Sequence, residues 1–119
     1  MKKLFYILFI LGCLTSVFGQ KKATLKQGNK FYEKKEYVKA AEIYEQLKPT
    51  KDILQKLGDS YYNNFQMTNA VRAYGQLFFS YKDSLDKETF FRYANALKGI
   101  DDYNKGDAIM SEYLGFEQN

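Results

Sequence analysis

The residue types that most often catalyse reactions or bind metals are nearly absent from this sequence. It contains no histidine, so the commonest general base and the commonest metal ligand are both missing. Its one cysteine is Cys13, which excludes a disulfide framework and a cysteine-based zinc site. The adjacent carboxylates Asp101 and Asp102 point in different directions at a helix start, so they suit helix capping better than acid–base catalysis. We expect Asp101 to be the N-cap of the last helix.

Catalytic sequence motifs are missing as well. No glycine-rich phosphate loop and no nucleophile motif is present. We therefore expect a protein that is not an enzyme, with no cofactor, no metal and no small-molecule substrate. Of its 119 residues 45% are hydrophobic and 18% aromatic, which suffices for the core of one small domain.

The first 19 residues have the three parts of a secretory signal peptide. Lys2 and Lys3 form a positive start, and an apolar stretch follows over residues 4–14. The small residues Val17 and Gly19 then fit the −3 and −1 positions of a cleavage site before Gln20. The sequence therefore predicts a signal peptide over 1–19 and export, with a mature domain over 20–119.

A second interpretation of the leader is a lipoprotein signal. In this interpretation "ILGC" is a lipobox and Cys13 is acylated, which would anchor the mature chain in a membrane. The apolar "LTSVF" after Cys13 favours simple cleavage, because a lipoprotein tether is usually polar. The mature chain carries 16 basic and 14 acidic residues, so its charge gives little reason to expect nucleic acid as a partner.

Three stretches of the mature sequence share one spacing of small and large residues. Each has a small residue followed three positions later by a large apolar one: Gly28 and Phe31, Gly58 and Tyr61, Ala94 and Leu97. A second small residue comes twelve positions after the first: Ala40, Ala70 and Gly106. A large residue follows four positions further on: Tyr44, Tyr74 and Met110. The agreement of the offsets in three copies indicates an internal repeat.

Each copy is predicted to form two antiparallel helices. Spacings of three and four place the named residues on one helical face. Small residues such as Ala40 allow the two helix axes to approach closely, and the neighbouring aromatic side chains fill the space beside them. The expected helices cover 22–34, 37–48, 51–64, 67–81, 86–99 and 102–115.

This repeat resembles the tetratricopeptide repeat, which has a period of about 34 residues. The copies, at about 21–49, 51–82 and 86–116, begin 30 and then 36 residues apart, counted between their first small residues. The short spacing implies a tight link around Pro49, and the long one an extra turn near residues 80–88. The family's early tryptophan is replaced by Thr24, Leu54 and Phe90. The resemblance implies an all-α, right-handed solenoid of about three helix hairpins.

The resemblance also implies a binding groove on the concave face, which the first helix of each hairpin lines. The positions of this sequence that match are Leu25, Asn29, Tyr32, Gln55, Asp59, Tyr62, Asn63, Phe91, Asn95 and Lys98. Asparagine can bond backbone amides and tyrosine offers rigid apolar area, so an extended peptide is the expected partner. The alternative is a solvated face on which Tyr32 and Tyr62 only pack between copies.

A closer resemblance rests on four phrases: "AEIYEQL", "LQKLGDSYY", "AVRAYGQLF" and "FRYANALKGIDDYNKGD". With the leader, they resemble the start of OmpA-family outer-membrane proteins of Bacteroidetes-type bacteria. In that family a tetratricopeptide region is followed by β-domains and a peptidoglycan-binding domain, and some members associate with type IX secretion or gliding machinery. None of the peptidoglycan-binding residues is present in this sequence.

These resemblances imply a periplasmic, non-enzymatic scaffold associated with the outer membrane, which binds proteins or extended peptides. A small periplasmic lipoprotein or chaperone anchored through Cys13 is the alternative. The last expected helix carries an apolar set: Ile109, Met110, Tyr113 and Leu114, with Phe116 just beyond it. We expect either a longer chain or a partner to cover this edge.

Overall fold

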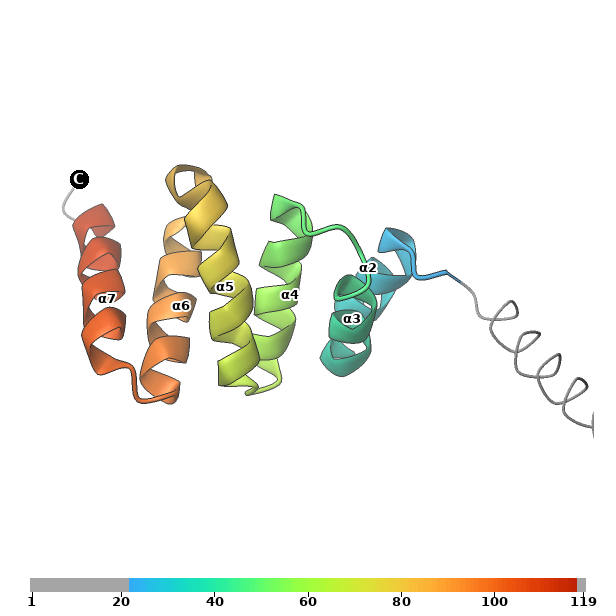
Figure 1. The fold of residues 1–119 in the computed structure, drawn as a ribbon, viewed down its shortest axis with the longest axis horizontal. Helices are drawn as coiled ribbons and strands as arrows, with labels where there is room; N and C mark the ends of the chain where they lie inside the picture. Colours follow the sequence, from blue (N-terminus) through green and yellow to red (C-terminus); the bar gives the residue numbers. More distant parts are fainter. Residues whose placement is uncertain (1–21, 118–119) are drawn as a thin grey trace, which may run out of the picture.

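The computed structural model describes residues 22–117, and among these residues helices are the only regular secondary structure. The helices are α2 (Leu25–Glu33), α3 (Tyr37–Tyr44), α4 (Lys51–Asn63), α5 (Met67–Tyr81), the short 3₁₀ helix η1 (Lys82–Ser84), α6 (Lys87–Gly99) and α7 (Tyr103–Glu117). They lie in a row in chain order, and the extensive contacts join helices that are consecutive in the chain (Figure 1). The prediction of an all-α fold is confirmed. The expected signal peptide, including Cys13, lies outside the described residues.

The first helix of each pair begins at a side-chain cap. Thr24 and Gln27 form a capping box at α2, in which each side chain accepts a hydrogen bond from the other residue's backbone N–H. Thr50 Oγ1 accepts from the Ile53 N–H at α4, and Asp86 Oδ1 accepts from the Thr89 N–H at α6. The second helices α3 and α5 begin without a side-chain cap. Their starts are fixed instead by the tight turns that precede them.

These turns repeat one unusual backbone conformation. Lys35, Phe65 and Asp101 have φ values of 61°, 59° and 65°, and each lies seven residues after the first small residue of its copy. The residue after each one donates its N–H back across the helix end, as from Glu36 to the Phe31 carbonyl at 2.9 Å. This is the Schellman pattern, which usually has glycine at the left-handed position. Here none of the three residues is a glycine.

The structure corrects two expectations about helix ends. Asp101 is not the N-cap of the last helix, because it occupies the left-handed turn. Asp102 is in the capping position, and its Oδ1 accepts from the Lys105 N–H at 3.4 Å. The helix expected over 37–48 ends at Tyr44. The chain then tightens into turns, in which the Gln46 N–H donates to the Ile43 carbonyl at 3.0 Å and the Leu47 N–H to the Tyr44 carbonyl at 3.1 Å. The extra turn expected after α5 is present as η1.

Small residues lie where paired helices cross, as the repeat predicted. Ala40, Ala70 and Ala94 are fully buried, and Gly28 and Gly58 are buried as well. A Cβ atom on Gly58 would lie 2.5 Å from Cε1 of Tyr74, and one on Gly28 would lie 2.7 Å from Cε1 of Tyr44. The tyrosine rings therefore occupy the space that a larger residue would need.

The core continues between pairs through aromatic contacts. Phe78 of α5 packs on Phe90 and Tyr93 of α6, with ring centroids 4.7 and 4.6 Å apart. Tyr74 lies 6.1 Å from Tyr93. None of the described helices is both long enough and apolar enough to cross a membrane.

Candidate functional site

The residues predicted for the groove all lie on the first helices α2, α4 and α6. Asp59 is buried and Leu25 is exposed, whereas the others are half-buried. The half-buried members are Asn29, Tyr32, Gln55, Tyr62, Asn63, Phe91, Asn95 and Lys98. The structure shows what holds most of these side chains in place. We call the ten residues predicted for the groove the first-helix face.

Polar contacts join the first two helix pairs on this face. We call them a polar tie: one side-chain oxygen accepts from a tyrosine of its own pair and from a basic residue of the next pair. Asn29 Oδ1 accepts a hydrogen bond from the Tyr44 hydroxyl of its own pair at 2.7 Å. The same oxygen accepts from Lys56 Nζ of the next pair at 3.1 Å. Lys56 also lies 3.4 Å from Asp52, one helical turn away. The asparagine therefore links both helices of its pair to the first helix of the following pair.

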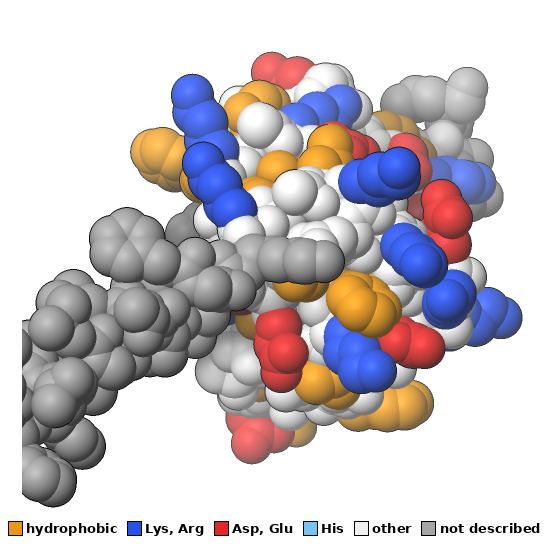
Figure 2. Space-filling model, turned by 90° about the vertical axis from the view of Figure 1, so that its right-hand side faces the viewer, with side chains coloured by type: hydrophobic (Ala, Val, Ile, Leu, Met, Phe, Trp, Pro, Cys, Tyr) orange, Lys and Arg blue, Asp and Glu red, His pale blue; other side chains and the backbone are white. Residues whose placement is uncertain are grey.

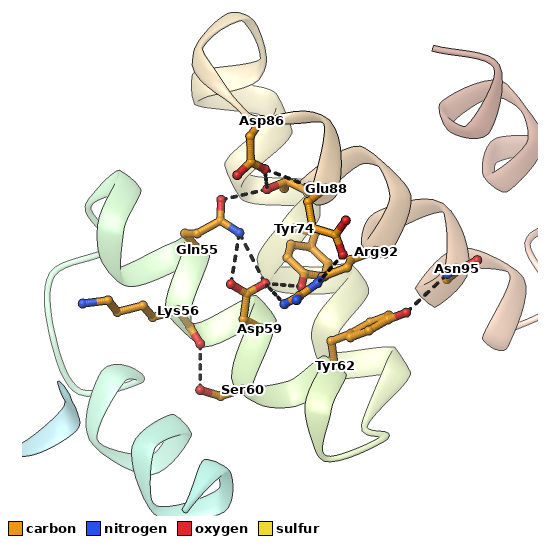
Figure 3. Close-up of polar contacts among 11 residues, drawn as sticks. Gln55, Lys56, Asp59, Ser60, Tyr62, Tyr74, Asp86, Glu88, Arg92 and Asn95 are labelled. Atoms are coloured by element: carbon orange, nitrogen blue, oxygen red, sulfur yellow. Dashed lines mark hydrogen bonds and ion pairs between the residues drawn. The ribbon is translucent and has the colours of Figure 1, made fainter. Parts of the chain in front are cut away.

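The same tie recurs one copy later, with charged residues (Figure 3). Asp59 Oδ1 accepts from the Tyr74 hydroxyl at 2.6 Å and pairs with Arg92 Nη1 of α6 at 3.1 Å. Gln55 donates to both Asp59 carboxylate oxygens at 3.3 Å, and its own carbonyl accepts from the Thr89 hydroxyl at 3.0 Å. Asp59 is thus held by three side chains, and its main role is to fix the register of α4 against α6.

The third copy has a different arrangement. Asn95 corresponds to Asn29 and Asp59, but its amide Nδ2 donates to the Tyr62 hydroxyl at 3.3 Å. The Arg92 guanidinium lies over the Tyr62 ring, 5.6 Å from its centroid. Tyr62 therefore does pack between copies, as one of the two interpretations expected, and it is half-buried.

The remaining members of the face are positioned by the helix that follows. Phe91 packs on Tyr113 with ring centroids 5.3 Å apart, and Lys98 Nζ lies 3.2 Å from Asp107. Tyr32 contacts the rings of Tyr37 and Tyr44 edge-on. Asn63 ends α4. These contacts restrict the rotamers of the face before any partner binds.

The electrostatics of the tie favour a neutral phenol. Burial, and then the nearby Asp59 carboxylate, raise the pKa of Tyr74 well above its ordinary value. Burial acts to lower the pKa of Arg92, but Asp59, Tyr74 and Glu88 together outweigh this effect and the net shift is upward. Tyr74 therefore remains a hydrogen-bond donor and Arg92 a cation at any physiological pH.

Sequence reasoning missed the donors of these ties. Lys56 and Arg92 lie two residues before the small residue of their copies, and Lys26 occupies the same place in the first copy. The recurrence of a basic residue at this position in all three copies was the sequence signal for these donors. The acceptors, Asn29 and Asp59, come one residue after the small residue, and Asn95 has the same place in the third copy.

A second polar cluster, outside the first-helix face, was also missed. Glu45 Oε1 accepts from the Tyr61 hydroxyl at 2.5 Å and from the Arg72 guanidinium, so it joins α3, α4 and α5. Burial would raise the pKa of the Glu45 carboxyl, but the hydrogen bonds from Tyr61 and Arg72 lower it overall. The Arg72 guanidinium also lies 5.8 Å from the Tyr61 ring centroid.

The α2 end of the molecule carries several lysines, with acidic side chains among them (Figure 2). Residues 22–36 contain five lysines and two glutamates, and four of the lysines recur every fourth residue on exposed positions: Lys22, Lys26, Lys30 and Lys34. One of the glutamates, Glu36, lies 3.5 Å from Lys39.

Among residues 22–117, no group of three or more acidic, histidine or cysteine side chains is placed to hold a metal ion. The first-helix face offers phenol rings, amides, the Asp59 carboxylate and one basic side chain, that of Lys98. No known protein family matches this sequence. Neither a curated protein nor a solved structure shows significant similarity to it.

Proposed function

We propose that this protein is a non-enzymatic scaffold that binds an extended segment of another protein along the first-helix face. The observation that carries the proposal is the repeated tie, from Lys56 to Asn29 and from Arg92 to Asp59. Because the same contact recurs between successive pairs, the first helices lie in register. Their half-buried tyrosines and amides then form one continuous, pre-organised surface, which lowers the entropic cost of binding.

The fold in this proposal is a tetratricopeptide-like solenoid of three helix pairs, with the first-helix face on its concave side. Its supports are the three copies of one residue spacing, the buried small residues at the helix crossings and the recurrent turns at Lys35, Phe65 and Asp101. Contacts that run mainly between consecutive helices are typical of such repeat arrays.

A selection experiment tests the binding proposal. The full chain would be used to select binders from a display library of unstructured twelve-residue peptides. The selected peptides should bind the Tyr62→Ala variant at least tenfold more weakly, while Phe79→Ala leaves binding unchanged. Phe79 is a suitable control because it is 93% exposed on α5. Selected peptides that tolerate Tyr62→Ala but not Phe79→Ala would place the binding surface elsewhere and overturn the proposal.

We further propose that the scaffold acts in the periplasm of a Bacteroidetes-type bacterium, as the front module of an OmpA-family envelope protein. Type IX secretion or gliding components are the corresponding partner class. The support is the leader and the four phrases that resemble that family. Mass spectrometry of the mature protein tests export: an N-terminus at Gln20, free or cyclised, agrees with it. Acylated Cys13 would replace this proposal by the lipid-anchored assembly factor, and an intact Met1 would contradict both.

A further inference from the structure

The outer side of α7 carries apolar residues of the kind that are buried elsewhere in the row, but no described helix packs on it. Leu114 is 52% exposed, although the equivalent residue of the preceding pair, Phe78, is only 9% exposed. Phe78 is covered because Phe90 and Tyr93 of α6 pack on it. α7 is the last helix of the row, and no described helix lies on its outer side (Figure 1).

The polar tie is also incomplete at this edge, because its acceptor has no donor among the described residues. Asn29 and Asp59 each accept from a tyrosine of their own pair and from a basic residue of the next pair. At Asn95 the tyrosine is replaced by Met110, which has no hydroxyl. Within the described part of the chain, Asn95 Oδ1 accepts no hydrogen bond, so this acceptor remains available.

The helices that already fill this kind of edge share a residue pattern. α4 and α6 each carry apolar residues at positions i, i+3 and i+7, with a basic residue at i+2. In α4 these are Leu54, Leu57, Tyr61 and Lys56, and in α6 they are Phe90, Tyr93, Leu97 and Arg92. Phe90 and Tyr93 pack on Phe78 of the preceding pair. The Tyr61 hydroxyl donates to Glu45 of the pair before it. Each basic residue reaches the Asn or Asp of the preceding pair.

The opposite end of the row departs from this pattern. At the i and i+3 positions α2 has Thr24 and Gln27, which are engaged with each other in the capping box. A polar pair at these positions gives α2 a solvent-compatible outer surface, as terminal repeats require. α2 of a second copy is therefore a poor occupant of the α7 edge, because it would set polar groups against Met110 and Leu114.

We infer that the α7 edge binds an amphipathic helix of a partner protein, one with apolar residues at i, i+3 and i+7 and a basic residue at i+2. This helix lies on α7 as α6 lies on α5, and its basic residue donates to Asn95 Oδ1. The site shares Asn95 with the first-helix face, but it recognises a helix by its apolar stripe and not an extended peptide.

The chain itself supplies the probe for a test. A fluorescein-labelled peptide with the sequence of residues 86–100 carries the pattern of α6. Its matched control carries Phe90→Thr and Tyr93→Gln, the pair found in α2. Titration of the full chain, followed by fluorescence anisotropy, should give at least tenfold tighter binding for the first peptide. Equal binding of the two peptides would overturn the inference.

Variants of the chain locate the site. Leu114→Glu places a charge on the edge at an already exposed position, and it should weaken peptide binding at least tenfold. Val38→Glu is the control, since Val38 is 48% exposed on α3, far from α7 in the chain. Unchanged binding to Leu114→Glu would show that the peptide binds elsewhere, for example by displacing α6.

The polar contact has its own test. Asn95→Asp should tighten binding severalfold at low salt, because Asp59 already pairs with Arg92 in this way. The gain should disappear with an Arg92→Gln peptide, and its presence with that peptide would contradict the role of Asn95.

Sedimentation of the full chain tests whether a second copy occupies the edge instead. A dimer that Leu114→Glu dissociates, without peptide binding, would assign the edge to a second copy and overturn the inference.

Discussion

Glycine and tyrosine meet at the same place in the first two helix pairs. Gly28 contacts Tyr44 and Gly58 contacts Tyr74, and both pairs are separated by 16 residues. Each ring edge lies where a Cβ atom would be, and each tyrosine is almost completely buried. The hydroxyl of the same ring is held by the residue next to the glycine, Asn29 or Asp59. The small residue thus allows both a close helix crossing and a buried hydrogen bond.

We predict opposite effects for two glycine-to-alanine substitutions. Gly58→Ala should lower the free energy of unfolding by about 1–2 kcal/mol, because overpacking against the fixed Tyr74 ring outweighs the gain in helix propensity. Gly115→Ala should raise it by up to about 1 kcal/mol, since a Cβ there meets nothing within 4 Å. Urea denaturation followed by circular dichroism measures both. A Gly58→Ala variant as stable as the parent would show that α4 and α5 can accommodate a methyl group where they cross.

The small residues could be predicted from the sequence, whereas the left-handed turns could not. A repeated spacing marks the helix crossings, because only small residues fit there. Lys35, Phe65 and Asp101 carry no such mark, since none of them is glycine or asparagine. Their identical offset in the three copies was the only signal. Phe65 at φ 59° is the most strained of them, because bulky residues rarely adopt this conformation.

Between elements, tyrosine hydroxyls join helices that are consecutive in the chain. Burial is the largest influence that raises the pKa of Tyr44 to about 12. Burial and then the Glu45 hydrogen bond raise the pKa of Tyr61 to about 12. The reference value for both is 10.0. Both residues connect α-helices through a hydroxyl that must keep its proton.

These tyrosines predict a loss of stability in alkali. Below pH 10 both are neutral in the folded and in the unfolded chain, and their hydrogen bonds stabilise the fold. As the pH rises from about 10 through about 12, the unfolded chain ionises first and is favoured, so stability falls. The urea midpoint measured from pH 8 to pH 11.5 should decline less in a Tyr44→Phe, Tyr61→Phe variant. Parallel declines would mean that other groups cause the alkaline loss.

Helix positions were largely predictable, and their ends were less so. The apolar spacing located all six described α-helices to within a few residues. The start of α2 was missed because the capping box of Thr24 and Gln27 was overlooked. The predicted face residues do lie together on α2, α4 and α6. Their internal ties could not be predicted, because a single sequence does not show that Lys56 and Arg92 reach back to the preceding pair.

Over the whole molecule, stability is unevenly distributed. The largest fully buried side chains are concentrated in α5 and α6, including Tyr74, Leu77, Tyr93 and Leu97. α2 and α3 contain only 9 and 8 residues, and each has a large hydrophobic residue close to half exposed, Leu25 and Val38. In an array of this kind each pair is supported only by its neighbours.

We therefore predict a gradient of hydrogen exchange along the chain. Backbone amides of α2 and α3 should exchange at least tenfold faster than those of α5 and α6, because local opening of the first pair breaks fewer buried contacts. Exchange of the full chain, followed by mass spectrometry, measures this gradient. Equal protection from α2 to α6 would show that the described helices unfold as one cooperative unit.

The contrast between the two ends bears on how such a protein can lengthen by gene duplication. The middle pair, residues 51–82, is compatible with a neighbour on either side, because Lys56 reaches back to Asn29 while Asp59 receives Arg92. A tandem duplicate of this pair would fit into the row without further substitution. A duplicate of the first pair would instead bury Thr24 and Gln27 at an interior boundary. Addition of a whole pair is thus compatible with the fold on the C-terminal side of the first pair, whereas on its N-terminal side it buries polar groups and destabilises the fold.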